Sequence, residues 1–374
     1  MISSVTLQEI KIGTSVEDLE TPSIIIDSEI MEENLRDMAD FARKAGKKLR
    51  PHSKTHKIPE LALKQIDYGA VGVCSQKVSE AKVMIDNGVK DVMITNQVIA
   101  EEKLQVLAQL AEKAKVSVCV DGVPGIELLQ NAARDNNVEL RCLIEIDSGM
   151  HRSGVTPSEA AELAKLIAKS EGLIFDGIMG FEGQVNNFPK NEWPPIVKEA
   201  MDVVSKAKSE IEHAGILVEN VVVGGTPSAK IVATFPDVTE ITPGEYIFYD
   251  YEHLSSGLVP IRQCALSVLS TVVSRPAPER AILDAGCKTF DFDECRFPGP
   301  KDPSLKVKFV GLSEEHGTVI LEDEPTRSRF RIGEKLEFLP YHVCPCVNLH
   351  DEVFFYRRGR IEKISKVLAR GKVY

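Results

Sequence analysis

Three ionisable side chains occupy alternate positions in the stretch RPHSKTHK, which runs from Arg50 to Lys57. If this stretch continues a strand, Arg50, His52 and Lys54 share one face, because side chains alternate along a strand. A lysine near other positive charge in a partly desolvated site has a lowered pKa, and its neutral amine can act as a base or attack a carbonyl. A solvated strand end with a few basic residues is the alternative, and the spacing leaves both interpretations open.

Two glycine-rich segments carry groups suited to binding an anion. The segment GMHRSG, residues 149–154, follows an apolar run, and its glycines would allow a turn that directs Arg152 inward. A surface ion pair is the alternative for this arginine. After another apolar run, Gly224 and Gly225 allow close backbone approach, Thr226 adds a hydroxyl, and the N-terminus of a following helix would favour negative charge. We expect phosphate at this second loop, rather than a tight turn capped by threonine.

A histidine and a cysteine lie two residues apart in the sequence YHVCPC near the C-terminus. In extended backbone His342 and Cys344 would share a face, and imidazole with thiolate is a donor pair that zinc accepts. Two protein ligands would leave positions for water and substrate. The alternative is a strand with Cys344 and Cys346 in the core. Glu315 or His316, in a hairpin-like turn, could supply a further ligand or only cap the turn.

Apolar, β-branched runs alternate with helix-like segments through the first two thirds of the chain. The expected strands are Lys48–Lys54, Ala70–Ser75, Asp91–Thr95, Val116–Asp121, Leu140–Asp147, Ile174–Gly180, Asn220–Gly224 and Thr239–Ile241. Alternation of this kind indicates a parallel sheet, and about eight repeats predict a (β/α)₈ barrel, in which loops at the carboxyl ends of the strands carry the chemistry. A doubly wound sheet is less favoured because no GxGxxG follows the first strand.

From Gln263 onward, short alternating strands separated by turns with proline and glycine predict a second, mostly β domain. The expected strands are Cys264–Ser274, Ala281–Asp284, Leu305–Val310, Thr318–Leu321 and Lys335–Leu339. We expect the barrel to span residues 22–250. Residues 1–21 and 251–374 would form the β domain, which carries His342 and Cys344.

The composition narrows the classes of function. A net charge of −11 argues against a nucleic-acid partner. Residues 1–20 lack a basic region followed by an apolar one, and no apolar run is long enough to cross a bilayer, so we expect neither a signal peptide nor a membrane partner. Most of the eight cysteines lie within apolar runs, which is typical of reduced core cysteines in a cytoplasmic protein.

Taken together, these residues resemble the D-threonine aldolase and D-serine dehydratase family of fold-type III pyridoxal-phosphate enzymes. The matching motifs, in family order, are RPHSKTHK (50–57), GMHRSG (149–154), GGTP (224–227), PGEYIFYD (243–250), LDAG (283–286), SEEHG (313–317) and HVCP (342–345). The resemblance implies a cofactor-bearing α/β barrel, a C-terminal β domain and a homodimer.

The resemblance also implies roles for individual residues. Lys54 would carry pyridoxal 5'-phosphate covalently, with Lys57 and Lys288 as competing lysines. The other residues implied to bind this cofactor are Arg152, Gly224, Gly225, Thr226 and Tyr249. A divalent metal, with zinc favoured over manganese or magnesium, would be bound by His342 and Cys344.

The implied substrates are β-hydroxy-D-amino acids, with two reactions open. Retro-aldol cleavage gives glycine and an aldehyde, whereas elimination of water gives a 2-oxo acid and ammonia. The aldolase branch tends to have His-x-Asp at the metal, so His342-x-Cys344 tilts the expectation slightly to dehydration. An amino-acid racemase and a non-catalytic pyridoxal-phosphate carrier are the alternatives. The metal pair argues against the racemase, and the second domain argues against the carrier.

Overall fold

The computed structural model describes residues 10–291 and 296–374, which divide into two compact units. Residues 10–33, 248–255 and 259–367 form one, here named the β unit. Residues 34–247, 256–258 and 368–374 form the other, the barrel unit. The division differs from the expected limits, because residues 22–33 group with the β unit and residues 368–374 with the barrel unit. Residues 1–9 of the expected N-terminal segment lie outside the described residues.

The barrel unit contains eight parallel strands in the order β2-β9-β8-β7-β6-β5-β4-β3. They are β2 (Lys48–Leu49), β3 (Val73–Ser75), β4 (Asp91–Ile94), β5 (Lys115–Val120), β6 (Leu140–Ile146), β7 (Leu173–Gly180), β8 (Val221–Val223) and β9 (Glu240–Ile241). A parallel bridge between His52 and Cys74 joins the two ends of this order, so the sheet curls round on itself. The predicted (β/α)₈ barrel is confirmed.

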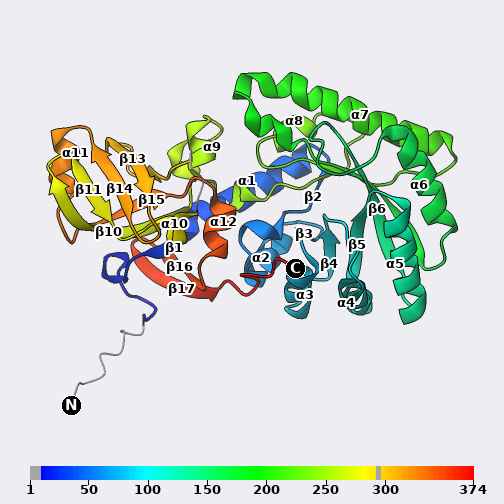
Figure 1. Ribbon diagram of the computed structural model, residues 1–374, viewed down its shortest axis with the longest axis horizontal. Helices are drawn as coiled ribbons and strands as arrows, with labels where there is room; N and C mark the ends of the chain where they lie inside the picture. The colour runs from blue at the N-terminus through cyan, green and yellow to red at the C-terminus, as the bar shows by residue number, and fades with distance from the viewer. Residues whose placement is uncertain (1–9, 292–295) are drawn as a thin grey trace, which may run out of the picture. The chain divides into compact units, whose positions relative to one another are not determined.

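Helices lie along the outer face of this sheet (Figure 1). They are α1 (Ser28–Lys44), which begins in the β unit, α2 (Pro59–Asp67), α3 (Val78–Asp86), α4 (Glu101–Ala111), α5 (Val123–Asn136), α6 (Pro157–Lys169), α7 (Trp193–His213) and α8 (Ala229–Val232). The start of α6 shows how local sequence sets a boundary: Thr156 and Glu159 form a reciprocal capping box around Pro157. None of the helices in the described ranges is long and apolar enough to cross a membrane.

Alternate residues of the barrel strands point inward and pack as a core. This cluster consists of Cys74, Met93, Cys119, Leu143, Met179 and Val222. Burial raises the pKa of the Cys74 and Cys119 thiols well above the ordinary value, so these thiols stay protonated and unreactive. The expectation of reduced core cysteines holds for both.

The β unit is built on a nine-stranded sheet that contains β1 (Ser23–Asp27) between β10 (Leu266–Ala277) and β16 (Glu352–Arg357). Its other strands are β11 (Arg280–Leu283), β12 (Gly299–Pro300), β13 (Val307–Leu312), β14 (Gly317–Leu321), β15 (Lys335–Leu339) and β17 (Arg360–Lys366). Four short helices join it: α9 (Tyr251–Ser255), α10 (Cys287–Phe290), α11 (Glu324–Arg329) and α12 (Val343–Asn348). The predicted mostly β domain is confirmed, although β1, β12, β16 and β17 were not among the expected strands.

Candidate active site

One cavity of the barrel unit is lined by five residues that the sequence predicted as cofactor-binding. They are Lys54, Arg152, Gly224, Gly225 and Thr226. The cavity contains about 710 Å³ of space free of protein atoms, which includes space open to solvent. Its wall includes residues that directly follow barrel strands, such as Thr95 after β4 and Gly224 after β8. The cavity therefore lies at the carboxyl ends of the strands, where barrels of this type carry their chemistry.

Lys54 reaches the cavity from a turn rather than from a strand. The strand β2 ends at Leu49, and Ser53–Thr55 form a single 3₁₀ turn, so the predicted strand 48–54 is too long. Pro51 helps to end the strand because it has no backbone N–H to donate to a neighbouring strand. Extended backbone continues to His52, which forms the parallel bridge with Cys74, so the alternation that would put Lys54 on the face of Arg50 is broken at the turn that begins at Ser53.

His52 supports the turn that carries Lys54. The Lys54 backbone N–H donates to His52 Nδ1 at 3.3 Å, so Nδ1 must be unprotonated. On the other side of the ring, Nε2 lies 3.0 Å from Thr95 Oγ1 and 3.2 Å from Gln76 Oε1, which places the ring proton on Nε2. Burial, and then the positive charge of Lys54, hold the pKa of His52 well below its usual value. His52 is thus a neutral positioning group in the cavity wall.

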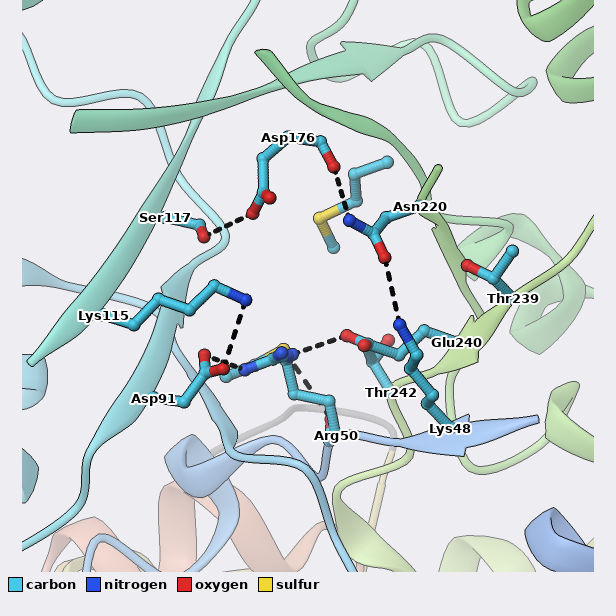
Figure 2. Close-up of polar contacts among 12 residues, drawn as sticks. Lys48, Arg50, Asp91, Lys115, Ser117, Asp176, Asn220, Thr239, Glu240 and Thr242 are labelled. Carbon is cyan, nitrogen blue, oxygen red and sulfur yellow. Dashed lines mark hydrogen bonds and ion pairs between the residues drawn. The ribbon is translucent and has the colours of Figure 1, made fainter. Parts of the chain in front are cut away.

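Arg50 was expected to share a strand face with Lys54, but it belongs to a separate ion-pair network. Figure 2 shows its guanidinium between two carboxylates: Nε lies 2.5 Å from Glu240 Oε1 and Nη1 lies 2.6 Å from Asp91 Oδ1. Lys115 adds an ion pair to Asp91 at 3.3 Å. Glu240, Asp91 and Lys115 are the first residues of β9, β4 and β5, so this network lies at the amino ends of the strands. Arg50 stabilises the barrel there and does not support Lys54 in the cavity.

Neither competing lysine lines this cavity. Lys57 is buried and its ammonium group lies 3.2 Å from Glu80 Oε1. Lys288 belongs to the β unit and pairs with Glu314 at 2.7 Å and Glu315 at 3.0 Å. Glu315, which the sequence offered as a further metal ligand, is thus engaged with a lysine.

Backbone geometry explains why glycines occupy the loop Gly224–Thr226, here named the anion loop. Gly224 has φ +95°, and a Cβ there would lie 3.0 Å from a Val232 methyl group, so other residues would be strained. A Cβ on Gly225 would lie 3.3 Å from the Phe181 ring. The helix α8 that follows the loop spans only Ala229–Val232, so its N-terminus offers little dipole. An anion in this cavity would therefore contact the loop Gly224–Thr226 rather than the N-terminus of α8.

Thr226 has its hydroxyl oriented by two backbone groups. The N–H groups of Gly244 and Tyr246 both donate to Thr226 Oγ1 at 3.2 Å. Because these bonds use the oxygen as an acceptor, the hydroxyl proton is left to donate to another group. A buried hydroxyl arranged in this way suits a phosphate oxygen.

Glu182 lines the cavity and was not among the predicted site residues, although its loop follows the predicted strand that ends at Gly180. Its side chain is buried, Ser228 donates a short hydrogen bond to Oε1, and the Gly225 N–H lies 3.3 Å from the same oxygen. Burial raises the pKa of this carboxyl, against hydrogen bonds from Ser228 and Gly225 that lower it. Its Oε2 has no hydrogen-bond partner within the described part of the chain. Glu182 therefore buttresses the anion loop with one oxygen and leaves the other unsatisfied.

The loop that carries Arg152 has the expected glycine turn. Gly149 has φ +110° and Gly154 has φ +100°, conformations that glycine adopts without strain. The Arg152 guanidinium carbon lies 5.5 Å from the centre of the Phe181 ring, a cation–π distance. The cavity thus brings together an amine, a guanidinium, a glycine loop and a hydroxyl, which is a donor set that suits a phosphorylated aldehyde.

In the β unit, His342 and Cys344 lie at the start of α12. His342 is the N-cap residue and Cys344 is helical, so the expected extended backbone over this pair is wrong. His342 itself keeps extended backbone (φ −126°, ψ 118°), and one of its ring nitrogens lies within 4.8 Å of Cys344 Sγ, so both atoms can reach one metal ion. Cys346 is buried, and its thiol donates to the Thr289 carbonyl at 3.3 Å. Of the two cysteines, Cys344 suits a metal and Cys346 anchors the helix.

Tyr249, the last residue predicted to bind the cofactor, belongs to the β unit. It is buried, with φ +48°, and its ring packs edge-on against His253 at 5.6 Å between ring centres. Among the described residues, those that line the barrel cavity do not include it.

Comparisons with known proteins cover nearly the whole chain. The family model for the alanine racemase N-terminal domain matches residues 26–252, and one for a serine dehydratase domain matches residues 265–356. A D-threonine aldolase from Arthrobacter sp. is 35% identical over 96% of this chain and 95% of its own length. A 3-hydroxy-D-aspartate aldolase from Paracoccus denitrificans is also 35% identical, over 97% of this chain and 95% of its own.

Structural similarity agrees with the sequence. The crystal structure of a D-threonine aldolase from Filomicrobium marinum matches with a TM-score of 0.93 and 35% identity, covering 98% of this chain and 100% of that one. These matches, over both units, show that the chain belongs to the pyridoxal-phosphate-dependent lyase family that contains the D-threonine and 3-hydroxy-D-aspartate aldolases.

Proposed function

We propose that this protein is a pyridoxal-phosphate-dependent, divalent-metal-assisted lyase acting on β-hydroxy-D-amino acids. The proposal rests on one observation: Lys54 and the loop Gly224–Thr226 line the same cavity. The two aldolases at 35% identity support the substrate class.

Pyridoxal phosphate, when bound, supplies a ring that stabilises negative charge on the substrate's Cα. The Lys54 amine would attach it, and the Gly224–Thr226 loop would hold its phosphate, with the Thr226 hydroxyl donating. Arg152 would lie beside the ring. The Lys54 amine, when it is not attached to the cofactor, would be placed to take a proton near Cα. His52, held neutral, would keep Lys54 directed into the cavity without adding a second positive charge.

A divalent metal, when bound, supplies a Lewis acid for the substrate's β-hydroxyl group. His342 and Cys344 would hold it, and the thiolate favours zinc over manganese or magnesium. Two protein ligands leave coordination positions for substrate and water.

The choice between the two reactions depends on which proton is removed. Removal of the β-hydroxyl proton breaks Cα–Cβ, whereas removal of the Cα proton leads to loss of water. We propose retro-aldol cleavage as the principal reaction, because the two relatives at 35% identity are aldolases. Dehydration is the second candidate, favoured by the thiolate at the metal and by the match of residues 265–356 to a dehydratase domain.

The test offers D-threonine, D-serine and 3-hydroxy-D-aspartate separately to the loaded enzyme and identifies products by mass spectrometry. Glycine with an aldehyde supports the aldolase, and a 2-oxo acid with ammonia supports the dehydratase. Interconversion of D- and L-amino acids without cleavage would overturn both in favour of a racemase. No turnover of any substrate would favour a non-catalytic carrier.

We also propose that the protein is a cytoplasmic homodimer. The family resemblance supports the dimer, and the described cysteines, which are free rather than joined in disulfides, support a reducing compartment. Light scattering coupled to gel filtration checks the dimer, and cell fractionation checks the compartment.

A further inference from the structure

A short segment of the β unit, residues 250–253, lies directly against the chain that leads into α12. The Tyr251 N–H donates to the Pro340 carbonyl at 3.0 Å, and the Glu252 N–H donates to the Tyr341 carbonyl at 3.1 Å. Two consecutive backbone bonds hold this segment in register with the residues just before His342. The segment ends the motif PGEYIFYD and continues past it, and the proposed function gives these residues no task.

Asp250 reaches from this segment to the helix that carries the proposed metal ligands. The Val343 N–H, between His342 and Cys344 in sequence, donates to Asp250 Oδ2 at 3.0 Å. The other carboxylate oxygen, Oδ1, lies 2.5 Å from His253 Nδ1. The Asp250 side chain is 0% exposed, so both bonds form away from water, where hydrogen bonds to a charged group are strong.

Glu252 contacts His342 itself. Glu252 Oε2 lies 3.5 Å from His342 Nδ1, and the two side chains are 19% and 34% exposed. A histidine that binds a metal through one ring nitrogen commonly directs its other N–H at a carboxylate, which fixes the tautomer and the ring orientation. With Nδ1 facing Glu252, Nε2 would be the nitrogen that coordinates the metal.

We propose that Asp250 and Glu252 are positioning residues for the metal: Asp250 sets the start of α12 through Val343, and Glu252 orients the His342 ring. This inference rests on the proposed function, because it assumes that His342 and Cys344 bind a divalent cation. Neither carboxylate is a ligand. Together they hold the imidazole and the thiolate in place before the cation arrives.

The test measures cobalt(II) binding to the full-length, cofactor-loaded protein after metal has been removed with a chelator. Affinity is determined by competition with a chelating dye, and thiolate coordination by charge-transfer absorption. We expect Glu252→Gln to weaken cobalt binding about 10- to 100-fold while the charge-transfer band keeps its position. Asp250→Asn should weaken binding over the same range. The control is Glu324→Gln, which removes an 82% exposed carboxylate of the same unit and should leave affinity unchanged.

Each other outcome has a defined meaning. Cobalt affinity within twofold of the unchanged protein for Glu252→Gln would overturn the positioning role, even if Asp250→Asn fails to fold. A shifted charge-transfer band would overturn it as well, by making Glu252 a ligand. If the unchanged protein binds no cobalt, or Cys344→Ser binds it equally well, the proposed metal site fails and the inference fails with it.

Discussion

At the scale of single residues, the stretch RPHSKTHK separates into distinct tasks. Lys54 and His52 line the cavity, whereas Arg50 pairs with Glu240 and Asp91 at the opposite ends of the strands. Lys57 pairs with Glu80. Four of the five basic side chains in these eight positions thus have different surroundings, and of these four only Lys54 is an amine that lines the cavity.

We expect Lys54→Ala to lose the visible absorption band of the bound cofactor after dialysis and to lower turnover by roughly 10³-fold or more. The reason is that no other lysine lines the cavity among the described residues. Absorption spectra after dialysis check this, with Lys57→Ala and Lys288→Ala as controls that should keep the band. A borohydride-reducible adduct that persists in Lys54→Ala would assign the attachment to another lysine.

Variants of Cys344 and Cys346 can separate a metal ligand from a structural cysteine. Cys344→Ser should lower metal affinity by more than the ~100-fold that loss of a supporting partner causes, because it removes a ligand. Cys346→Ser should mainly lower stability, because its thiol is buried against the Thr289 carbonyl. Metal content and melting temperature, measured on both variants, separate these effects. Equal loss of metal from the two would indicate a structural cysteine pair.

At the scale of elements, very short strands, turns and helices carry the residues of the candidate site. β2 has two residues, the Lys54 turn is a single 3₁₀ turn, and α8 has four residues. Such elements have few backbone bonds of their own, so side chains hold them. His52 holds the Lys54 turn, Thr226 accepts from the segment that starts at Gly244, and Asp250 holds the start of α12.

The junction between the Lys54 turn and α2 should be sensitive to acid. His56 is buried; its Nδ1 accepts from the Ile58 N–H, which leaves Nε2 to donate to Gln65 Oε1. Burial lowers the pKa of His56 to about 4 from 6.5. The unfolded chain binds a proton on this histidine more readily than the folded protein does. The folded protein therefore has its full stability above pH 6.5 and loses stability as the pH falls towards 4. The loss is about 3 kcal/mol.

Chemical denaturation at pH 7 and pH 4.5 measures this effect. We expect His56→Asn to have a smaller difference in free energy of unfolding between the two pH values than the unchanged protein. His151→Asn, which changes an 81% exposed histidine, is the control and should retain the full difference. An unchanged pH dependence in His56→Asn would show that other groups are responsible.

At the scale of the whole molecule, the residues proposed for the two cofactors belong to different compact units. Lys54 and the anion loop are in the barrel unit, whereas His342 and Cys344 are in the β unit. Lys54 and the proposed metal ligands His342 and Cys344 therefore belong to different cores.

This separation predicts the result of metal removal. Treatment with EDTA should abolish lyase activity and leave the visible cofactor band in place, and zinc, manganese or magnesium added singly should show which metal restores turnover. Activity and absorption measured on the same sample check this. Unchanged turnover in metal-free protein would exclude a metal-assisted reaction, and simultaneous loss of the band would show that the two sites are not independent.

The sequence by itself determined the features that depend on local pattern. Alternating strand and helix runs predicted the barrel, the change in period near residue 263 predicted the β unit, and glycines at 149, 154 and 224 marked turns that the structure contains. These predictions hold because periodicity and allowed backbone angles are properties of neighbouring residues.

Only the tertiary structure decided which groups meet. Arg50 finds Glu240, 190 positions away in sequence, and Asp91, 41 positions away, so alternation within one stretch could not reveal its partners. Glu182 reaches the anion loop in the same way, 46 positions from Ser228. His342 and Cys344 were predicted as a pair in extended backbone, but only His342 is extended, and Cys344 lies in the first turn of α12. The sequence could predict the chemistry available to each residue. It could not predict the partners of that residue, because these depend on strand order and on packing between segments far apart in the chain.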